Sequence, residues 1–235
     1  MSTAQAEILY QNDQLVVLNK PSGLSVLRDR SGASCLWDQL PDLLNGKPYQ
    51  VHRIDKGTSG ALLVARNAQT QKALTQAFHS RQVRKYYLAW VTGSVERAGL
   101  IDLPLRRGRK SRYRVAGQRA DIVDNGRSWQ LAGSCDPAGR ASSTRMRPLR
   151  HSEARSLLLL QPLTGRTHQL RVHLSWIGHP ILGDQLYGRQ ADPLQQSTRL
   201  QLHCHRLVVR GFGSYAAPLP PDWFTTLEPN ERPIA

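Results

Sequence analysis

A polar stretch followed directly by an apolar run most constrains how this chain folds. Residues 52–56 (His-Arg-Ile-Asp-Lys) lead into a Gly-Thr-Ser-Gly turn at 57–60, and residues 61–65 (Ala-Leu-Leu-Val-Ala) have the length and composition of a buried strand. The glycines of the turn allow a positive φ or a close approach by another segment. An aspartate on a tight turn between two buried strands is a rigidly presented carboxylate. The alternative is an Asx-turn, in which Asp55 only caps its own backbone.

Residues 52–60 (His-Arg-Ile-Asp-Lys-Gly-Thr-Ser-Gly) resemble the catalytic motif of the RluA family of RNA pseudouridine synthases, His-Arg-Leu-Asp-x-x-Thr-Ser-Gly. Ile54 in place of leucine is the only departure. Three other stretches resemble family motifs in the family's order: Lys-Pro-x-Gly at 20–23, Lys-x-Tyr-x-Ala at 85–89, and Thr-Gly-Arg-Thr-His-Gln-Leu-Arg at 164–171. The resemblance extends over about residues 8–224, which is nearly the whole chain.

The charge balance points to a polyanionic partner. The chain has 32 Lys and Arg against 17 Asp and Glu, a net charge of +15, so nucleic acid and an anionic membrane surface are the two candidates. No apolar run approaches the length of a membrane span, and the arginines are dispersed, which disfavours the membrane. The N-terminus lacks the features of a secretory signal, and three scattered cysteines suit a reducing compartment. We therefore expect a cytoplasmic protein that binds RNA and no membrane.

Hydrophobic periodicity predicts the main elements. We expect strands at residues 14–19, 142–149, 155–161 and 200–209, with residues 157–160 buried on both faces, and helices at 35–44, at 68–82 with Asn67 as N-cap, and from Arg166 onward. The stripe Ala73, Leu74, Ala77 and Phe78 is read as core. The resemblance implies an α+β fold, the pseudouridine synthase catalytic fold, with a mixed, mostly antiparallel sheet and flanking helices and loops around a central cleft.

The family resemblance also implies the site. Asp55 is the essential carboxylate, and it either attacks C1′ of the target ribose or removes its 2′ proton; Tyr87 stacks on the uracil; Arg166 pairs with Asp55. Predicted substrate contacts in the motifs are His52, Arg53, Lys20, Lys85 and Leu170. Charge alone adds Arg106, Arg107, Arg109 and Lys110 as predicted substrate contacts. The alternatives are a core role for Tyr87 and a phosphate contact or a helix-surface position for Arg166. Tyr86 faces the other way, so the choice of Tyr87 rests on the strand register.

One stretch is unusually basic. Six of the nine residues at 106–114 are Arg or Lys, which excludes a core position and favours either a solvated loop or an arm that contacts phosphates. Residues 115–141 are polar and rich in glycine, so we expect a loop or a weak hairpin there. No metal-ligand spacing is present, and His203 with His205 on one strand face is the only weak metal candidate. The reaction that the family resemblance implies needs no cofactor.

We expect residues 1–235 to form a single catalytic domain (core about 8–224), with no S4-like RNA-binding domain ahead of it, and to act as a monomer. The predicted function is isomerisation of specific uridines to pseudouridine in 23S rRNA, in the tRNA anticodon stem-loop, or in both, with a tRNA-only enzyme as the alternative. A non-catalytic RNA-binding protein would have lost a motif residue, and none is lost. DNA binding is disfavoured, because the sequence has neither a helix-turn-helix pattern nor the ligand spacing of a zinc finger.

Overall fold

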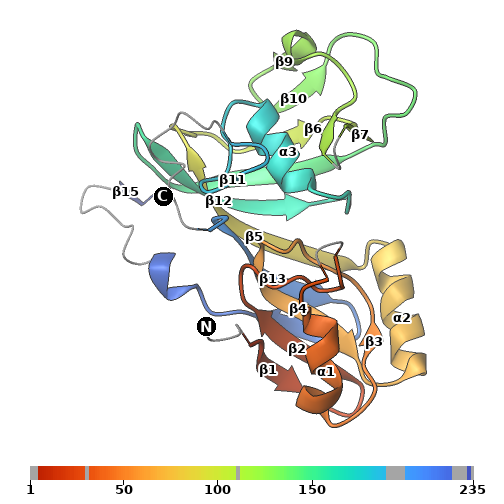
Figure 1. Cartoon of the computed structure of the whole chain (residues 1–235). Coiled ribbons are helices and arrows are strands. Elements are labelled where there is room, and N and C mark those ends of the chain that lie inside the picture. Colours follow the sequence, from red (N-terminus) through yellow and green to blue (C-terminus); the bar gives the residue numbers. More distant parts are fainter. Residues whose placement is uncertain (1–4, 30–31, 110–111, 189–198, 224–231, 234–235) are drawn as a thin grey trace. The chain divides into compact units, whose positions relative to one another are not determined.

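A computed structural model describes residues 5–29, 32–109, 112–188, 199–223 and 232–233 (Figure 1). The chain forms two compact units. The first comprises residues 1–85 and 202–221, and the second comprises residues 86–201 and 222–235. The chain passes from the first unit to the second within strand β5 (Val83–Thr92).

The first unit is built on a sheet with the strand order β1-β2-β4-β13. The β1–β2 and β2–β4 pairs are antiparallel, whereas β4 and β13 run parallel. In Figure 1 β13, from the blue end of the chain, lies beside the orange β4. The elements of this unit are β1 (Glu7–Gln11), β2 (Leu15–Lys20), α1 (Leu36–Leu44), β3 (Tyr49–Gln50), β4 (Ser59–Ala65), α2 (Ala68–His79), β13 (Leu202–Val209) and β14 (Gly213–Ala216).

Burial confirms the two apolar strands expected in this unit. All seven residues of β4 are buried, as are five of the six residues of β2. An apolar run without alternation is typical of a strand covered on both faces. The strand that leads into residues 20–23 and the strand that follows the turn at 57–60 therefore pair within the core of one unit.

Both predicted helices of this unit are present. The Asn67 side chain accepts a hydrogen bond from the Thr70 backbone N–H at 2.8 Å, which is the predicted N-cap. Helix α2 ends at His79, three residues earlier than expected, and Arg81 beyond it has the left-handed φ of 57°. The buried face of α2 is Thr70, Leu74 and Ala77, so placing Ala73 in the core was wrong. The i, i+4, i+7 spacing of that face is one narrow stripe.

Gly60 allows β4 and β13 to approach each other. Its φ is +105°, and a Cβ at this position would lie 2.3 Å from the carbonyl oxygen of Cys204. This confirms the expectation that a glycine of the turn permits a close approach by another segment. Because the obstacle is backbone, no side-chain movement could relieve the clash.

Replacing Gly60 with alanine is expected to lower the free energy of unfolding by about 2–4 kcal/mol, through strain at a positive φ and overpacking against Cys204. Gly211→Ala is the matched control in the same unit. Gly211 has a φ of +81°, but nothing lies within 4 Å of the position of its Cβ, so only the strain of about 1–2 kcal/mol applies. Urea unfolding measures both variants, and equal losses would contradict the close-approach argument.

The second unit contains a sheet with the order β5-β12-β11-β6-β10-β9, in which β10 and β6 run parallel, and a separate two-stranded hairpin, β7–β8. Its further described elements are β6 (Gly99–Asp102), β7 (Leu105–Arg107), β8 (Tyr113–Val115), the 3-10 helix Arg119–Asp121, β9 (Ile122–Asp124), β10 (Ser128–Leu131), β11 (Ser143–His151), β12 (Arg155–Pro162), α3 (Gln169–Trp176) and β15 (Arg232–Pro233). A 3-10 helix at Pro221–Trp223 begins at the last residue of the first unit. The two units confirm an α+β fold with a mixed, mostly antiparallel arrangement of strands. The β9–β10 pair is the hairpin anticipated within residues 115–141.

One expectation for this unit was wrong. Strand β12 was expected to be buried on both faces, but Ser156, Leu158 and Leu160 are buried while Leu157 and Leu159 are only half-buried. One face of the strand is therefore only partly covered, a pattern that a run of leucines conceals.

Candidate active site

Asp55 lies at the start of a tight turn. Its carbonyl oxygen accepts a hydrogen bond from the Thr58 backbone N–H at 3.0 Å, and β4 begins one residue later at Ser59. The segment before the turn is not a buried strand as expected, because β3 is a half-buried pair of residues that ends at Gln50. Asp55 is therefore followed by a buried strand but is not preceded by one.

The motif alternates between buried and more exposed side chains. Ile54 is buried, whereas Arg53 is exposed and Asp55 is half-buried. Arg53 and Asp55 are thus accessible, whereas the residue between them is covered by the protein. Ser59 anchors the other end of the motif, since its Oγ lies 2.9 Å from Nδ1 of the buried His203.

Lys20 stabilises the turn from a buried position. Its ammonium donates hydrogen bonds to the carbonyl oxygens of Pro21 at 2.7 Å, Leu24 at 2.7 Å and Lys56 at 3.2 Å, and the side chain is fully buried. Burial lowers the pKa of Lys20 to about 7, while the negative charge of Asp55 raises it. The structure gives Lys20 a positioning role; its predicted contact with RNA stays a prediction.

His52 fixes the start of the motif against the first unit's core. Its Nε2 accepts a hydrogen bond from the Leu63 backbone N–H at 2.9 Å, and its ring stacks on Phe78 with centroids 4.7 Å apart. Burial lowers the pKa of His52 to about 3, and the positive charge of Lys85 lowers it further. A neutral imidazole that accepts through Nε2 carries its proton on Nδ1. These contacts of His52 are internal to the protein, and an RNA contact stays a prediction.

Lys85 and Tyr87 follow each other along β5. Lys85 is half-buried, and burial lowers its pKa while Cys204 raises it. Tyr87 is buried and lies opposite Leu160 of β12, whereas Tyr86 is half-buried. The register thus separates the two tyrosines onto different faces, as expected. The role assigned to Tyr87 stays a prediction.

Arg166 precedes α3 rather than lying on it. The helix begins at Gln169 after His168, which has a left-handed φ of 56°, so the prediction that the helix starts at Arg166 was wrong. Arg166 is exposed, its Nε donates to the Ala141 carbonyl at 3.2 Å, and its backbone N–H donates to Gln169 Oε1 at 3.0 Å. Leu170, a predicted substrate contact, is buried in the first turn of the helix.

Gln169 ties this loop to β11. Its Nε2 donates to the Ser143 carbonyl and to Thr144 Oγ1, both at 3.0 Å, while the Thr164 hydroxyl donates to its Oε1 at 2.7 Å. Most polar side chains of the motif at residues 164–171 thus make contacts within the protein. Arg166 is the one that the fold presents at the surface, which a sequence pattern could not distinguish.

His173, which lies on α3 two residues after this motif, is a buried neutral histidine. Its Nδ1 lies 3.0 Å from Thr144 Oγ1, and its Nε2 lies 2.9 Å from the Leu103 carbonyl oxygen. Burial lowers the pKa of His173 to about 4 from 6.5, although the Leu103 hydrogen bond and the charge of Asp102 raise it. The histidine therefore resists protonation in the folded state.

We expect the free energy of unfolding to fall as the pH drops from 6.5 toward 4. In this window the unfolded chain binds the proton of His173 and the folded chain does not, so acid favours unfolding by up to about 1.4 kcal/mol per pH unit. His52 acts in the same direction. Urea unfolding between pH 7 and 4.5 measures the slope, and His173→Gln should make it shallower. An unchanged slope in the variant would contradict this assignment.

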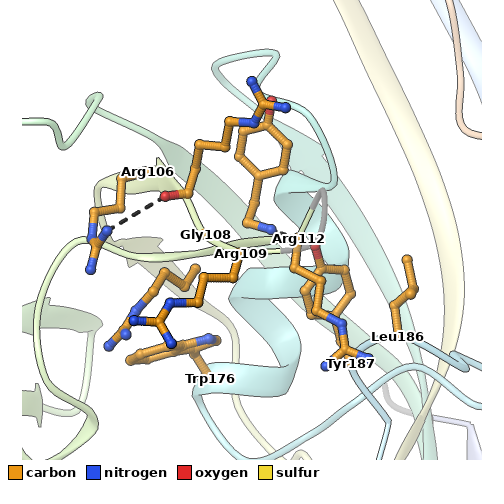
Figure 2. Close-up of a pocket in the computed structure, with 10 residues that line it drawn as sticks. Arg106, Gly108, Arg109, Arg112, Trp176, Leu186 and Tyr187 are labelled. Atoms are coloured by element: carbon orange, nitrogen blue, oxygen red, sulfur yellow. Dashed lines mark hydrogen bonds between the residues drawn. The ribbon is translucent and has the colours of Figure 1, made fainter.

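The basic stretch forms the hairpin β7–β8, and Lys110 lies outside the described residues. Its arginines line a pocket of about 910 Å³ together with the end of α3 and residues 186–187 (Figure 2). Arg106, Arg107 and Arg109 were predicted there from charge alone. Trp176 and Leu186 were not predicted, because a single aromatic or aliphatic residue carries no signal of a binding site.

The predicted site residues fall in different units. Asp55, Lys20, His52, Arg53 and Lys85 belong to the first unit, whereas Tyr87, Arg166, Leu170 and the arginines of the hairpin belong to the second. The Asp55–Arg166 pair and the central cleft both involve the placement of one unit against the other and stay predictions. Across the described residues, no three His, Cys, Asp or Glu side chains gather as metal ligands. Each described helix is too short or too polar to cross a bilayer.

Comparison with known proteins gives a consistent result. Residues 14–176 match the family described as RNA pseudouridylate synthase. The chain is 36% identical over 208 residues to the dual-specificity RNA pseudouridine synthase RluA of Vibrio vulnificus (86% of this chain, 76% of the relative). It is 33% identical over 216 residues to tRNA pseudouridine synthase C of Haemophilus ducreyi (87% and 82%). Among solved structures, human RNA Pseudouridylate Synthase Domain Containing 4 superposes with a TM-score of 0.77 at 27% identity, covering 92% of this chain and 90% of that chain.

Proposed function

Because the chain belongs to the RNA pseudouridylate synthase family, whose members are isomerases acting on RNA, we propose that it converts uridines to pseudouridine in both 23S rRNA and the tRNA anticodon stem-loop. The observation that carries this proposal is the turn that presents Asp55. A half-buried carboxylate follows an exposed arginine and precedes a fully buried strand, with a buried lysine beneath the turn.

Asp55 has two chemically consistent roles in this reaction. As a nucleophile, its carboxylate attacks C1′ of the ribose and expels uracil, which rotates and is rejoined through C5. As a base, it removes the 2′ proton so that uracil leaves with formation of a glycal. Both routes require the carboxylate to be ionised, and both end with the C5 proton lost to solvent. The net reaction is an isomerisation that needs no redox cofactor.

We propose that Arg166 keeps Asp55 ionised. A carboxylate near a bound base loses hydration, which raises its pKa, and a neighbouring guanidinium lowers it by about 1–3 units. The support is that Arg166 is exposed, whereas Gln169 and Arg171 of the same motif are buried. Flipping the target uridine out of its base stack costs a few kcal/mol. Arg53, which is exposed beside Asp55, would offset part of this cost by filling the space that the uridine leaves.

Tyr87 is proposed to stack on the uracil and to assist loss of the C5 proton, with Leu170 on the other side of the base. Tyr87→Phe separates the two tasks because it keeps the ring and removes the hydroxyl. We expect product formation to fall by about 10²-fold or more, while the affinity for RNA changes by less than about threefold. Single-turnover assays with RNA-binding measurements check this. An unchanged rate would leave Tyr87 only the stacking role.

The choice of two RNA classes rests on the relatives. The chain shares 36% identity with an enzyme named as dual-specificity and 33% with one named as a tRNA enzyme, so a tRNA-only enzyme is the second candidate. We also propose that both units form one catalytic domain that works as a monomer in the cytoplasm, where its RNA substrates are found. The family match supports the single domain, because residues 14–176 extend through both units.

Tritium release tests this proposal. Bulk tRNA and 23S rRNA, each labelled with tritium at C5 of uridine, are incubated separately with the protein. Release from both pools is expected. Release from tRNA alone selects the tRNA-only enzyme, and release from neither pool by folded protein that still binds RNA would favour a non-catalytic RNA-binding protein.

A further inference from the structure

The pocket beside the β7–β8 hairpin lies entirely within the second unit (Figure 2). It has a volume of about 910 Å³ and carries five arginines but no acidic residue among its lining residues. The lining consists of Arg106, Arg107, Gly108, Arg109, Arg112, Tyr113, Arg114, Trp176, Leu186 and Tyr187. None of the residues predicted to act on the target uridine, Asp55, Tyr87 or Arg166, is among them.

Most of the positive charge in this pocket is not neutralised by the protein. In the described part of the chain, no carboxylate forms an ion pair with Arg107, Arg109 or Arg112. The buried Nε of Arg114 also has no hydrogen-bond partner there. Arg106 is the exception, because its Nε lies 3.0 Å from Asp136. Guanidinium groups gathered in this way attract an anion with several oxygens.

The remaining wall of the pocket is apolar and aromatic. Trp176 is half-buried, and the guanidinium carbons of Arg114 and Arg119 lie 5.4 Å and 5.2 Å from its ring centroid. Leu186 is 39% exposed although it is a large aliphatic residue. A pocket for inorganic phosphate alone would need no such wall.

The pocket is held in shape by hydrogen bonds. The Tyr187 hydroxyl accepts from the Tyr113 backbone N–H at 2.9 Å and lies 2.9 Å from His168 Nδ1, which joins the hairpin to the segment before α3. Asp184 accepts hydrogen bonds from the backbone N–H groups of Leu186 and Tyr187 at 3.0 and 3.1 Å. These contacts fix Leu186 and Tyr187 beside the hairpin without requiring a ligand.

We propose that this pocket binds an unpaired nucleotide of the RNA substrate other than the uridine that reacts. Its flanking phosphates contact the arginines of the hairpin, and its base packs against Trp176 and Leu186. A nucleotide is the ligand that matches both walls, since RNA-binding proteins combine cationic grooves for the backbone with aromatic surfaces for unstacked bases. The proposal rests on the proposed function, in that it takes RNA as the substrate.

The phosphate contacts are tested with tetraadenylate RNA, which contains no uridine and so binds without reaction. The variant Arg109→Ala/Arg112→Ala removes two exposed side chains, and Arg127→Ala, also exposed and in the same unit but not in the pocket, is the control. In a plot of the logarithm of affinity against the logarithm of salt concentration, the magnitude of the slope should be smaller by about 1.4 in the double variant, because each lost phosphate contact removes about 0.7. The control should lower the slope by less than half that amount.

The base contact is tested with an abasic tetramer that has the same phosphates. Wild-type protein should bind the abasic RNA about 5- to 150-fold more weakly than tetraadenylate. Leu186→Glu, which adds a negative charge at an exposed position, should remove most of this difference. Tetraadenylate should also quench tryptophan fluorescence in the wild type, and the quenching should be lost in Trp176→Phe while binding is kept.

Several results would overturn the proposal. Equal affinity for abasic and base-containing RNA would mean a phosphate-only surface, and quenching that persists in Trp176→Phe would place the base elsewhere. An effect of Arg127→Ala as large as that of the double variant would mean diffuse attraction. These outcomes are independent of catalysis, because failure of the proposed function would appear instead as no tritium release by wild-type protein.

Discussion

Replacing Asp55 with asparagine is expected to abolish tritium release from both RNA pools. The amide keeps the size of the side chain but can neither attack C1′ nor accept the 2′ proton, so both routes are blocked. We expect the rate to fall by at least about 10³-fold, which lies within the range for loss of a positioned acid–base group. Single-turnover measurements at saturating RNA separate this loss from weaker binding. Circular dichroism and urea unfolding show whether the variant folds.

Asp29→Asn is the matched control for Asp55→Asn. It removes the partner of Lys56, whose ammonium lies 3.1 Å from Asp29 just after Asp55, and both side chains are exposed. An exposed ion pair contributes about 0–1 kcal/mol, so activity should stay within about twofold of wild type. Full activity of Asp55→Asn would refute the assigned role. Loss of activity in both variants would point to disturbance of the turn instead.

Arg166 can be tested in the same assay. If it keeps Asp55 ionised, Arg166→Met should move the acid limb of the pH–rate profile to higher pH, because removal of a neighbouring cation disfavours the charged form of a carboxylate. Arg166→Lys should restore part of the shift. A phosphate contact would instead weaken binding uniformly and leave the profile unchanged.

Replacing Asp184 with asparagine is expected to give the largest loss of stability. Asp184 is fully buried and holds Arg171 through two hydrogen bonds of 2.8 Å, from Nε and from Nη2. Removing one partner leaves a buried guanidinium without its counter-charge, which costs about 3–5 kcal/mol. Urea unfolding measures the loss. The substitution should also loosen residues 186–187, because Asp184 accepts hydrogen bonds from the backbone N–H groups of Leu186 and Tyr187.

Asp222→Asn is the control, because Asp222 makes the same bidentate contact with Arg199 at 2.9 and 2.7 Å but is 45% exposed at its side chain. Its loss should cost less than about 1 kcal/mol. The double variant Arg171→Met/Asp184→Leu should recover part of the stability, since a buried ion pair can be replaced by apolar groups of similar volume. Equal costs for the two single variants would show that burial is not what makes the Asp184 pair matter.

Several elements could be predicted because their signals are local. The apolar run before Ser22 and the one after Gly60 each specified a buried strand, and Asn67 specified the start of α2 through its own side chain. The net charge of +15 was enough to indicate a polyanionic partner. In each case the residues that carry the signal are also the residues that form the feature.

The errors arose where an element's environment decides its pattern. Four successive leucines in β12 were read as buried on both faces, but one face is only half covered by its neighbours. The start of α3 was placed at Arg166 because Thr164 and Gly165, directly before it, are typical of a helix start. The loop is instead held to β11 by Gln169, so the helix begins three residues later.

The sequence by itself determined the family and the candidate residues around Asp55, since the aspartate of residues 52–60 and its flanking charges are adjacent in the chain. Only the tertiary structure decided which polar residues of the motifs support the fold and which face solvent. Lys20 under the turn, Cys204 against Gly60, and Trp176 beside the arginines of the hairpin each join segments far apart in sequence. Local patterns record propensity and charge, but a contact between distant segments depends on how the whole unit packs.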